Sequence, residues 1–384
     1  LVLIPTTILF LLIIQLIIAQ SWQSLETAKL HDEVNRILIS APNNQLYQLE
    51  SQLSGKNEFK LSRLTDLSSP ISETAVTGAR VEIVGSNGSR WLLPEVSPGT
   101  YRAALSLSES LSYKLQIQTT GGSTYTSKET KLILTPPIDS LSWKYEDNNV
   151  TVYSHTHDPS NATRYYRWYF SETWETHAWY ETYFDFVNGS IVARPPGDQI
   201  FACRKEASSN TVIVGNSTTL TDDVISYQPI TTIAKPSEKM FVRYSVLVRQ
   251  IGLPREAYDF WTLLKKNTEL TGTLFDPQPS VLPTNILCTS DPSKKAIGYV
   301  SAAYVREKRL FIRNSQLSLW PYRNENTQCP AIETSRSAAE AFLAGNPGYL
   351  PAYYVTAGGN FGVAERKCVD CRLAGGTNIQ PAFW

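Results

Sequence analysis

The residues with the clearest capacity for chemistry are the five cysteines, of which Cys368 and Cys371 are separated by two residues. A structural zinc site needs four cysteine or histidine ligands in local pairs, whereas the other cysteines stand alone at Cys203, Cys288 and Cys329. A thioredoxin-like pair begins a helix, but the sequence "AGGTNIQP" that follows this pair has two glycines and a proline. These patterns favour disulfides over metal binding or redox catalysis.

We therefore expect two disulfides and one leftover cysteine. The spacing favours a bridge from Cys329 to either Cys368 or Cys371, which closes a loop of about 40 residues and contributes roughly 3 to 4 kcal/mol in the chain-entropy treatment. It also favours a bridge from Cys203 to Cys288 across the second domain. Disulfides persist in oxidising compartments, so this prediction depends on export of the protein.

An apolar, uncharged segment runs from Leu1 to Ala19. Its length could just span a bilayer, but its position and the small Ala19 before Gln20 and Ser21 are also typical of a secretory signal peptide. We predict that residues 1–21 are a signal peptide or a membrane anchor, through which the protein would associate with a membrane. Both interpretations place the remaining chain outside the cytoplasm, in the outer membrane, at the cell surface or in the periplasm.

The stretch "SHTHD" places His155 and His157 on one face of an extended strand, with Asp158 beside them. Such an arrangement could hold a metal ion at the surface, but no third imidazole lies near in the sequence. Solvated polar positions are the commoner explanation. We predict no metal site here.

A group of carboxylates lies close to His177, at Glu172, Glu175 and Glu181. They could act as the acid pair of a glycosidase, although carboxylates on a solvated strand or loop are commoner. The sequence contains no nucleophile elbow, no His-Glu-x-x-His helix and no phosphate loop. We therefore predict a non-catalytic binding protein that uses no cofactor, with an exported hydrolase of glycans or peptides as the alternative.

The segment "RYYRWYFSETWETHAWYETYF" is unusually rich in aromatic residues. Strand alternation places Trp168 on one face, and Tyr165 and Tyr169 on the other. One interpretation is a central strand of an immunoglobulin-like sandwich whose tryptophan fills the core. The other is an exposed stacking platform for a glycan or a peptide, for which the candidate residues are Tyr165, Tyr169, Trp174 and Trp179.

The composition indicates the class of fold that must position these residues. Basic and acidic residues number 35 each, so no net charge attracts nucleic acid. Short alternating runs such as "YKLQIQTTGGSTYTS" are separated by glycine, asparagine or proline, which is typical of β-sandwiches. We predict a mainly β protein with two immunoglobulin-like or fibronectin-like β-sandwich domains, one inserted helix and a loop-rich C-terminal tail that is stapled by disulfides.

The boundaries of these domains follow from breaks in the pattern. Pro136 and Pro137 cannot donate to a strand ladder and fix φ, so they mark a stiff boundary. Pro254 suits the first turn of a helix, and Gly272 suits its end. The prediction is a connector at 22–58, sandwiches at 59–135 and 138–320, a helix at 254–271 within the second sandwich, and a tail at 321–384.

Several stretches together resemble a known family: "VTGARVEI", "DPSNATRYYRWYFSETWE", "RYSVLVRQIGLPREAYDFWTLLKKNTELTGTLFDPQPSVLPTNILC", "IGYVSAAYVREKRLFI" and "CVDCRLAGGTNIQPAFW". They are similar to the Bacteroidota outer-membrane lipoproteins grouped as domain of unknown function 4249. The resemblance runs from about Phe59 to Trp384. It implies an exported cell-envelope protein, tethered by a lipidated cysteine, that assists a TonB-dependent receptor in nutrient uptake. In this sequence the first cysteine is Cys203, so no cysteine follows the apolar segment as it does in that family.

Overall fold

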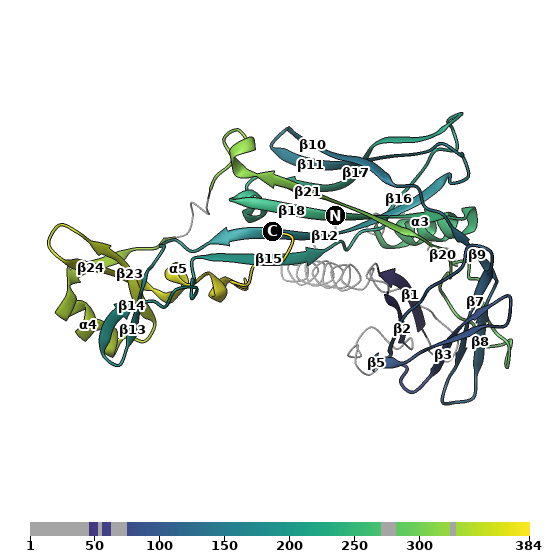
Figure 1. Ribbon diagram of the computed structural model, residues 1–384, viewed down its shortest axis with the longest axis horizontal. Helices are drawn as coiled ribbons and strands as arrows, with labels where there is room; N and C mark the ends of the chain where they lie inside the picture. Colours follow the sequence, from purple (N-terminus) through teal and green to yellow (C-terminus); the bar gives the residue numbers. More distant parts are fainter. Residues whose placement is uncertain (1–45, 53–55, 63–74, 270–281, 323–327) are drawn as a thin grey trace, which may run out of the picture.

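The structure is a computed structural model that describes residues 46–52, 56–62, 75–269, 282–322 and 328–384. The predicted signal peptide or anchor at 1–21 lies outside these residues. Figure 1 shows an elongated molecule with one sandwich at one end, a second sandwich in the middle and a smaller unit at the other end. Among the described helices, none is long and apolar enough to cross a bilayer.

The first sandwich consists of two sheets, antiparallel except for the pair β9 and β20. One sheet has the strand order β1-β2-β6-β5, and the other has the order β19-β8-β7-β3-β4, to which β9 and β20 are joined. The strands of the first sheet are β1 (Leu46–Gln52), β2 (Lys56–Ser62), β5 (Glu95–Ser97) and β6 (Thr100–Ala104). Those of the second are β3 (Arg80–Gly85), β4 (Arg90–Leu93), β7 (Ser112–Gln118), β8 (Thr124–Ser127), β9 (Thr130–Ile133), β19 (Ile286–Cys288) and β20 (Ala302–Ala303).

This sandwich contains strands that the sequence places elsewhere. Strand β1 and the start of β2 lie in the predicted connector, 22–58. Strand β19 pairs antiparallel with β8, and β20 pairs parallel with β9, although both lie within the predicted second domain. The chain therefore returns from the second sandwich to complete the first one.

The second sandwich lies in the middle of the molecule (Figure 1) and has the sheets β10-β11-β17 and β15-β12-β18-β21, with β16 beside β12. Its strands are β10 (Ile138–Glu146), β11 (Asn149–Asp158), β12 (Tyr165–His177), β15 (Ala202–Ser208), β16 (Ile213–Asn216), β17 (Asp223–Ala234), β18 (Arg243–Leu253) and β21 (Val305–Arg313). The short helices η1 (Glu238–Met240) and η2 (Asn314–Gln316) follow β17 and β21. Trp168 is buried in the core between the sheets, which confirms the prediction that this tryptophan fills the core of a sandwich.

Helix α3 (Arg255–Glu269) confirms the predicted helix at 254–271 within about two residues. Its residues Ala257, Phe260 and Trp261 are buried in the core of the first sandwich. The helix follows directly from β18, so it connects the second sandwich to the first. The two sandwiches nevertheless keep separate apolar cores, and α3 packs into that of the first.

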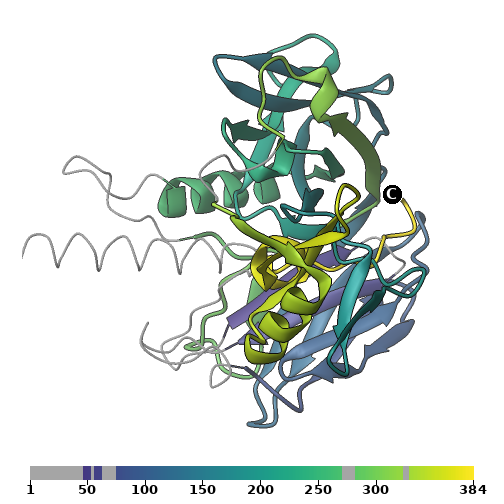
Figure 2. The ribbon, with the colours of Figure 1, turned by 90° about the vertical axis from the view of Figure 1, so that its left-hand side faces the viewer.

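The C-terminal tail is more regular than its sequence suggests. It forms the sheet β22-β24-β23, and the hairpin β13-β14 and helix α4 pack beside it. Figure 2 shows this unit facing the viewer. Its elements are β13 (Phe184–Val187), β14 (Ser190–Ala193), β22 (Ala331–Ser335), α4 (Arg336–Gly345), β23 (Tyr349–Val355), β24 (Asn360–Glu365), α5 (Arg366–Val369) and η3 (Cys371–Ala374). The mainly β class, the two sandwiches and the disulfide-stapled tail are confirmed.

Two disulfides staple this tail. Cys329 bonds to Cys368, as the spacing predicts. The predicted bridge from Cys203 to Cys288 is wrong, because Cys203 bonds to Cys371 and Cys288 is a free cysteine. Cys288 lies on β19, which belongs to the first sandwich, whereas Cys203 lies on β15 of the second. Because β19 pairs with β8, Cys288 lies in a different sandwich from Cys203, and the two cysteines cannot bond.

We expect the protein, denatured without reductant, to expose one reactive thiol, that of Cys288. This thiol is buried in the core of the first sandwich, so it should react with a thiol reagent only after unfolding. The measurement is a thiol titration of native and denatured protein, with Cys288→Ala as the control. More than one thiol in the denatured protein would contradict the disulfide assignment.

Candidate functional site

The four aromatic residues proposed as a stacking platform do not form one surface. Tyr165 and Tyr169 lie on one face of β12, and Tyr165 packs 5.0 Å, centroid to centroid, from Tyr258 of α3. Trp174 lies on the opposite face, within the core of the second sandwich. Trp179 packs against the core of the tail. The alternation along β12 separates Trp174 from the two tyrosines, because odd and even positions point to opposite sides of the sheet, and Trp179 lies beyond the end of this strand.

Tyr169 borders a small cavity between the two sandwiches. The guanidinium of Arg167 lies 3.7 Å from the centroid of the Trp261 ring and 5.7 Å from that of Tyr169. The cavity has a volume of about 90 Å³. Sites for small organic ligands are usually about 300 to 1,000 Å³, so this cavity can hold water but not a ligand of that size.

The carboxylates near His177 are also separated by the sheet. Glu172 is buried on the core side of β12, where it accepts a hydrogen bond of 2.5 Å from the hydroxyl of Tyr244. Burial and the Glu172 charge raise the pKa of Tyr244. Glu175 lies on the outer side, with His177 at 2.7 Å and Arg204 at 3.2 Å. Although burial opposes it, these two partners lower the pKa of Glu175. Glu172 and Glu175 therefore do not form an acid pair.

The "SHTHD" histidines have polar partners on neighbouring strands. His155 lies 2.7 Å from the hydroxyl of Ser142, and His157 lies 2.8 Å from Asp139. In the described part of the chain, no group of three histidine, cysteine or carboxylate side chains is placed to hold a metal ion. These contacts give both histidines a structural explanation.

We expect His157 to titrate above the ordinary histidine pKa of about 6.5. The hydrogen bond to Asp139 and the charge of that carboxylate favour the imidazolium, so they raise the pKa of His157. The pair of His157 with Asp139 therefore stabilises the folded state at low pH, and this stabilisation is lost as the pH rises through the raised pKa of His157. Proton NMR can follow the four histidines of the chain. In Asp139→Asn the His157 midpoint should fall towards 6.5; an unchanged midpoint would contradict the assignment.

An open pocket of about 510 Å³ lies where the second sandwich meets the tail, which is within the usual range for ligand sites. We call it the Arg194 pocket. It is lined by Glu181, Thr182, Tyr183, Arg194, Pro195, Pro196, Gly197, Asp198, Gln199, Phe201, Ala202, Arg204 and Gln380.

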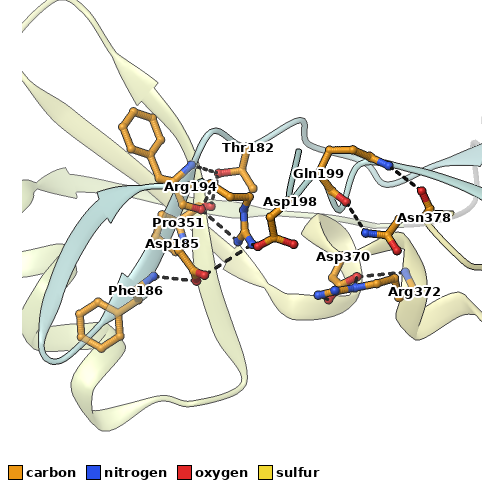
Figure 3. Close-up of polar contacts among 11 residues, drawn as sticks. Thr182, Asp185, Phe186, Arg194, Asp198, Gln199, Pro351, Asp370, Arg372 and Asn378 are labelled. Carbon is orange, nitrogen blue, oxygen red and sulfur yellow. Dashed lines mark hydrogen bonds and ion pairs between the residues drawn. The ribbon is translucent and has the colours of Figure 1, made fainter. Parts of the chain in front are cut away.

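Arg194 organises one wall of this pocket (Figure 3). It follows β14 directly, and its side chain is only 7% exposed. Its Nη1 lies 2.9 Å from Asp198 and 3.4 Å from Asp185, and its Nη2 donates to the carbonyl of Phe184 at 3.2 Å. A guanidinium held by two carboxylates cannot turn freely, so it fixes the position of Asp198 at the pocket wall.

Gln199 fixes the opposite end of the same loop. Its side-chain amide donates to the carbonyl of Ala202 and accepts from the amide of Ala202, each at 2.8 Å. Asn378 donates to the carbonyl of Gln199 at 2.8 Å (Figure 3). Thr182 donates to the carbonyl of Pro351 on β23 at 2.7 Å. The pocket is therefore a preformed feature that depends on contacts with the tail.

The Cys203–Cys371 disulfide ties the tail to β15, and a local charged pair, Asp370 with Arg372 (Figure 3), flanks Cys371. Asp370 accepts from the side chain of Arg372 at 2.8 Å, and from its backbone amide at 3.0 Å. Although burial opposes the effect, these contacts hold the pKa of Asp370 below its usual value. The ionised pair and the disulfide fix the segment that carries Asn378.

The groups that line the pocket are mostly polar, and two are aromatic, Tyr183 and Phe201. Tyr183 is 67% exposed, and a hydrogen bond to Glu181 raises its pKa. Asp198 is 43% exposed, so part of its carboxylate faces solvent. Arg194 and Arg204 balance Glu181 and Asp198 in charge. The pocket can therefore offer hydrogen bonds and a ring face to a ligand without attracting either sign of charge.

The sequence alone does not predict this pocket. One local signal is present in "ARPPGDQ", where two prolines and a glycine form a stiff turn between an arginine and an aspartate. The aromatic density of the preceding segment points instead to β12, most of whose rings pack into cores.

Comparison with known proteins identifies a family and a set of solved structures that includes the following two. A segment of chicken tenascin with two fibronectin type-III domains is 12% identical, covers 55% of this chain and 91% of its own, and has a TM-score of 0.17. The native conformation of E. coli alpha-2-macroglobulin is 8% identical, covers 58% of this chain and 14% of its own, and has a TM-score of 0.18. Both TM-scores are too low to carry an argument. No curated protein matches the chain. The profile of the domain of unknown function DUF4249 matches residues 41–309, more than half of the sequence, and the chain therefore belongs to the DUF4249 family.

Proposed function

We propose that this protein is a non-catalytic binding protein of the cell envelope that captures a neutral glycan in the Arg194 pocket. In this proposal it serves as an accessory to nutrient uptake by a TonB-dependent outer-membrane receptor, as its similarity to Bacteroidota lipoproteins implies. The observation that carries the proposal is the pocket itself, which has the volume of a ligand site and a wall of fixed polar groups.

The chemistry of the wall favours a polyhydroxylated ligand. Arginine, carboxylate and amide side chains are planar groups that donate or accept hydrogen bonds in pairs. The exposed ring of Tyr183 offers the apolar surface that the C–H face of a sugar needs. The equal number of cations and carboxylates gives no advantage to a charged ligand.

The disulfides support the location outside the cytoplasm. Two bridges tie the tail to the second sandwich and to itself. Such bridges persist in the periplasm and at the cell surface, and they are rare in the reducing cytosol. The proposed localisation is therefore the outer membrane or cell surface, reached by export.

Binding of neutral oligosaccharides by the purified protein is the direct test of the ligand. Calorimetric titration with a panel of such glycans should find a binder, and Tyr183→Ala should weaken it about tenfold, a loss of about 1.4 kcal/mol. Tyr183→Phe keeps the ring and should bind within about threefold of wild type, about 0.7 kcal/mol. Tyr227, 54% exposed and outside the pocket, gives the matched control Tyr227→Ala. Equal affinity in Tyr183→Ala and Tyr227→Ala would refute the assignment of the pocket.

Crosslinking in intact outer membranes, followed by mass spectrometry, tests the accessory role. A TonB-dependent receptor recovered as the main neighbour would support it. A protein recovered alone, and able to turn over a glycan or peptide library, would favour the hydrolase alternative instead.

A further inference from the structure

The outer face of the sheet β15-β12-β18-β21 carries an unusual number of arginines. Strand register places them on the side opposite the sandwich core, since their cross-strand partners are outward residues of the neighbouring strands. We call this surface the arginine face. It is formed by Arg204, Arg243, Arg249, Arg309 and Arg313.

The carboxylates on the same face do not balance these charges. Glu175 pairs with Arg204 at 3.2 Å, and Glu307 pairs with Arg249 at 2.7 Å. Glu206 is exposed on β15. Among the described residues, no carboxylate oxygen lies within 4.0 Å of a guanidinium nitrogen of Arg243, Arg309 or Arg313. Three guanidinium groups therefore lack a counter-charge in contact.

Aromatic rings occupy the positions that carboxylates would take. The guanidinium of Arg309 lies 3.5 Å from the ring centroid of Phe383. That of Arg243 lies 4.5 Å from Phe311 and 4.8 Å from Trp384. Figure 1 shows the end of the chain beside β12 and β18. A ring attracts a cation through its quadrupole but does not neutralise it, so the face keeps its positive charge under this cover.

Two open grooves are lined by arginines of this face. One, of about 380 Å³, is lined by Arg243 and Arg313 and by the carboxylate-bearing Glu175. The other, of about 480 Å³, is lined by Arg249, Arg309 and Phe383, together with the carboxylate-bearing Glu206. Burial and then the charge of Arg249 lower the pKa of Arg309, while the charges of Glu307 and Glu206 oppose this shift, so the repulsion between the two cations acts beside two carboxylates. An anion placed between them would relieve the repulsion.

We propose that the arginine face is a docking surface for an acidic segment of a partner protein, whose carboxylates enter the two grooves. Each guanidinium presents a planar fork that matches a carboxylate. The grooves favour a peptide over an anionic membrane, because an extended acidic chain can follow two grooves, whereas a membrane surface is flat. This surface shares Arg204 with the Arg194 pocket, but the arginines that line the two grooves lie outside that pocket, so the proposal stands independently of glycan binding.

Fluorescence anisotropy with fluorescein-labelled hexaglutamate and the purified full chain tests the proposal. Wild type should bind hexaglutamate, more weakly as salt screens the charges, and should not bind hexalysine. The double variant Arg309→Gln with Arg313→Gln should bind about tenfold more weakly. Arg309→Lys with Arg313→Lys keeps the charge and should retain most of the affinity. Arg255, 75% exposed on α3, supplies the control Arg255→Gln, which should bind as wild type.

Three results would overturn the proposal. One is equal affinity of the double glutamine variant and wild type, with unchanged circular dichroism in both. Another is absence of hexaglutamate binding by wild type. The third is binding of wild type to phosphatidylglycerol vesicles but not to hexaglutamate, which would show that the face reads a membrane surface instead.

Discussion

Replacing Trp168 by alanine is expected to destabilise the second sandwich by about 3 to 5 kcal/mol. Trp168 is 0% exposed and stacks on Tyr166 with ring centroids 5.6 Å apart. Its indole Nε1 donates to the side-chain carbonyl of Gln250 at 2.8 Å. The alanine variant would leave a large cavity and would also leave a buried acceptor without its donor. The shift of the urea midpoint for the transition of this sandwich measures the effect.

Two further variants separate the contribution of ring volume from that of the hydrogen bond, and compare this buried ring with a partly buried one. Trp168→Phe keeps most of the ring volume and loses the hydrogen bond to Gln250, so it should cost clearly less than Trp168→Ala. Trp91 lies in the first sandwich and is only partly buried, so Trp91→Ala should also cost less. A Trp168→Ala protein within about 1 kcal/mol of wild type would show that this ring does not hold the two sheets together.

Features encoded by neighbouring residues are predicted well from the sequence. The alternation along β12 is a property of the strand itself, so Trp168 is correctly placed in the core. The helix at 254–271 has a proline at its start and an apolar face, and it forms as α3. The alternation and the helix pattern each span only a few residues, so both can be predicted without knowledge of distant contacts.

Features that depend on distant strand pairing are not encoded locally. Strand β19 is three residues long and gains its place by hydrogen bonding to β8, more than 150 residues earlier in the sequence. Cys288 moves with β19 into the first sandwich, which explains why its predicted bond to Cys203 does not form. The sequence spacing of cysteines carries information about loop length but not about which sheets meet.

The Arg194 pocket combines locally encoded features with features that depend on distant contacts. The turn that carries Arg194 and Asp198 is local, and its glycine and prolines can be read from the sequence. Its fixing contacts come from Asn378 and Pro351, which belong to the far end of the chain. The aromatic residues that suggested a platform belong to different cores, because a strand alternates its side chains between two environments. This pocket forms only when the tail packs against the second sandwich, so it cannot be predicted from the local sequence.

Removing the disulfide between Cys203 and Cys371, by replacing both with alanine, is expected to cost about 2 to 5 kcal/mol and to weaken glycan binding in the Arg194 pocket. This bridge joins residues 168 apart in sequence, whereas Cys329–Cys368 joins residues 39 apart. In the chain-entropy treatment the longer loop contributes about 1 kcal/mol more. Beside the bridge, Arg204 and Thr377 exchange backbone hydrogen bonds of 2.7 and 2.9 Å, and these position the segment that contacts the pocket.

The matched control replaces Cys329 and Cys368 by alanine, which opens the shorter loop inside the tail. Thermal unfolding should place Cys203→Ala with Cys371→Ala below this control, and limited proteolysis should cleave its tail first, because the bridge to β15 is lost. Glycan affinity should fall more in the Cys203→Ala, Cys371→Ala variant than in the control, since only the Cys203–Cys371 bridge lies beside the tail segment that contacts the pocket. Equal midpoints and equal affinities in the two double variants would show that apolar packing in the tail core, rather than the bridge to β15, holds the pocket in shape.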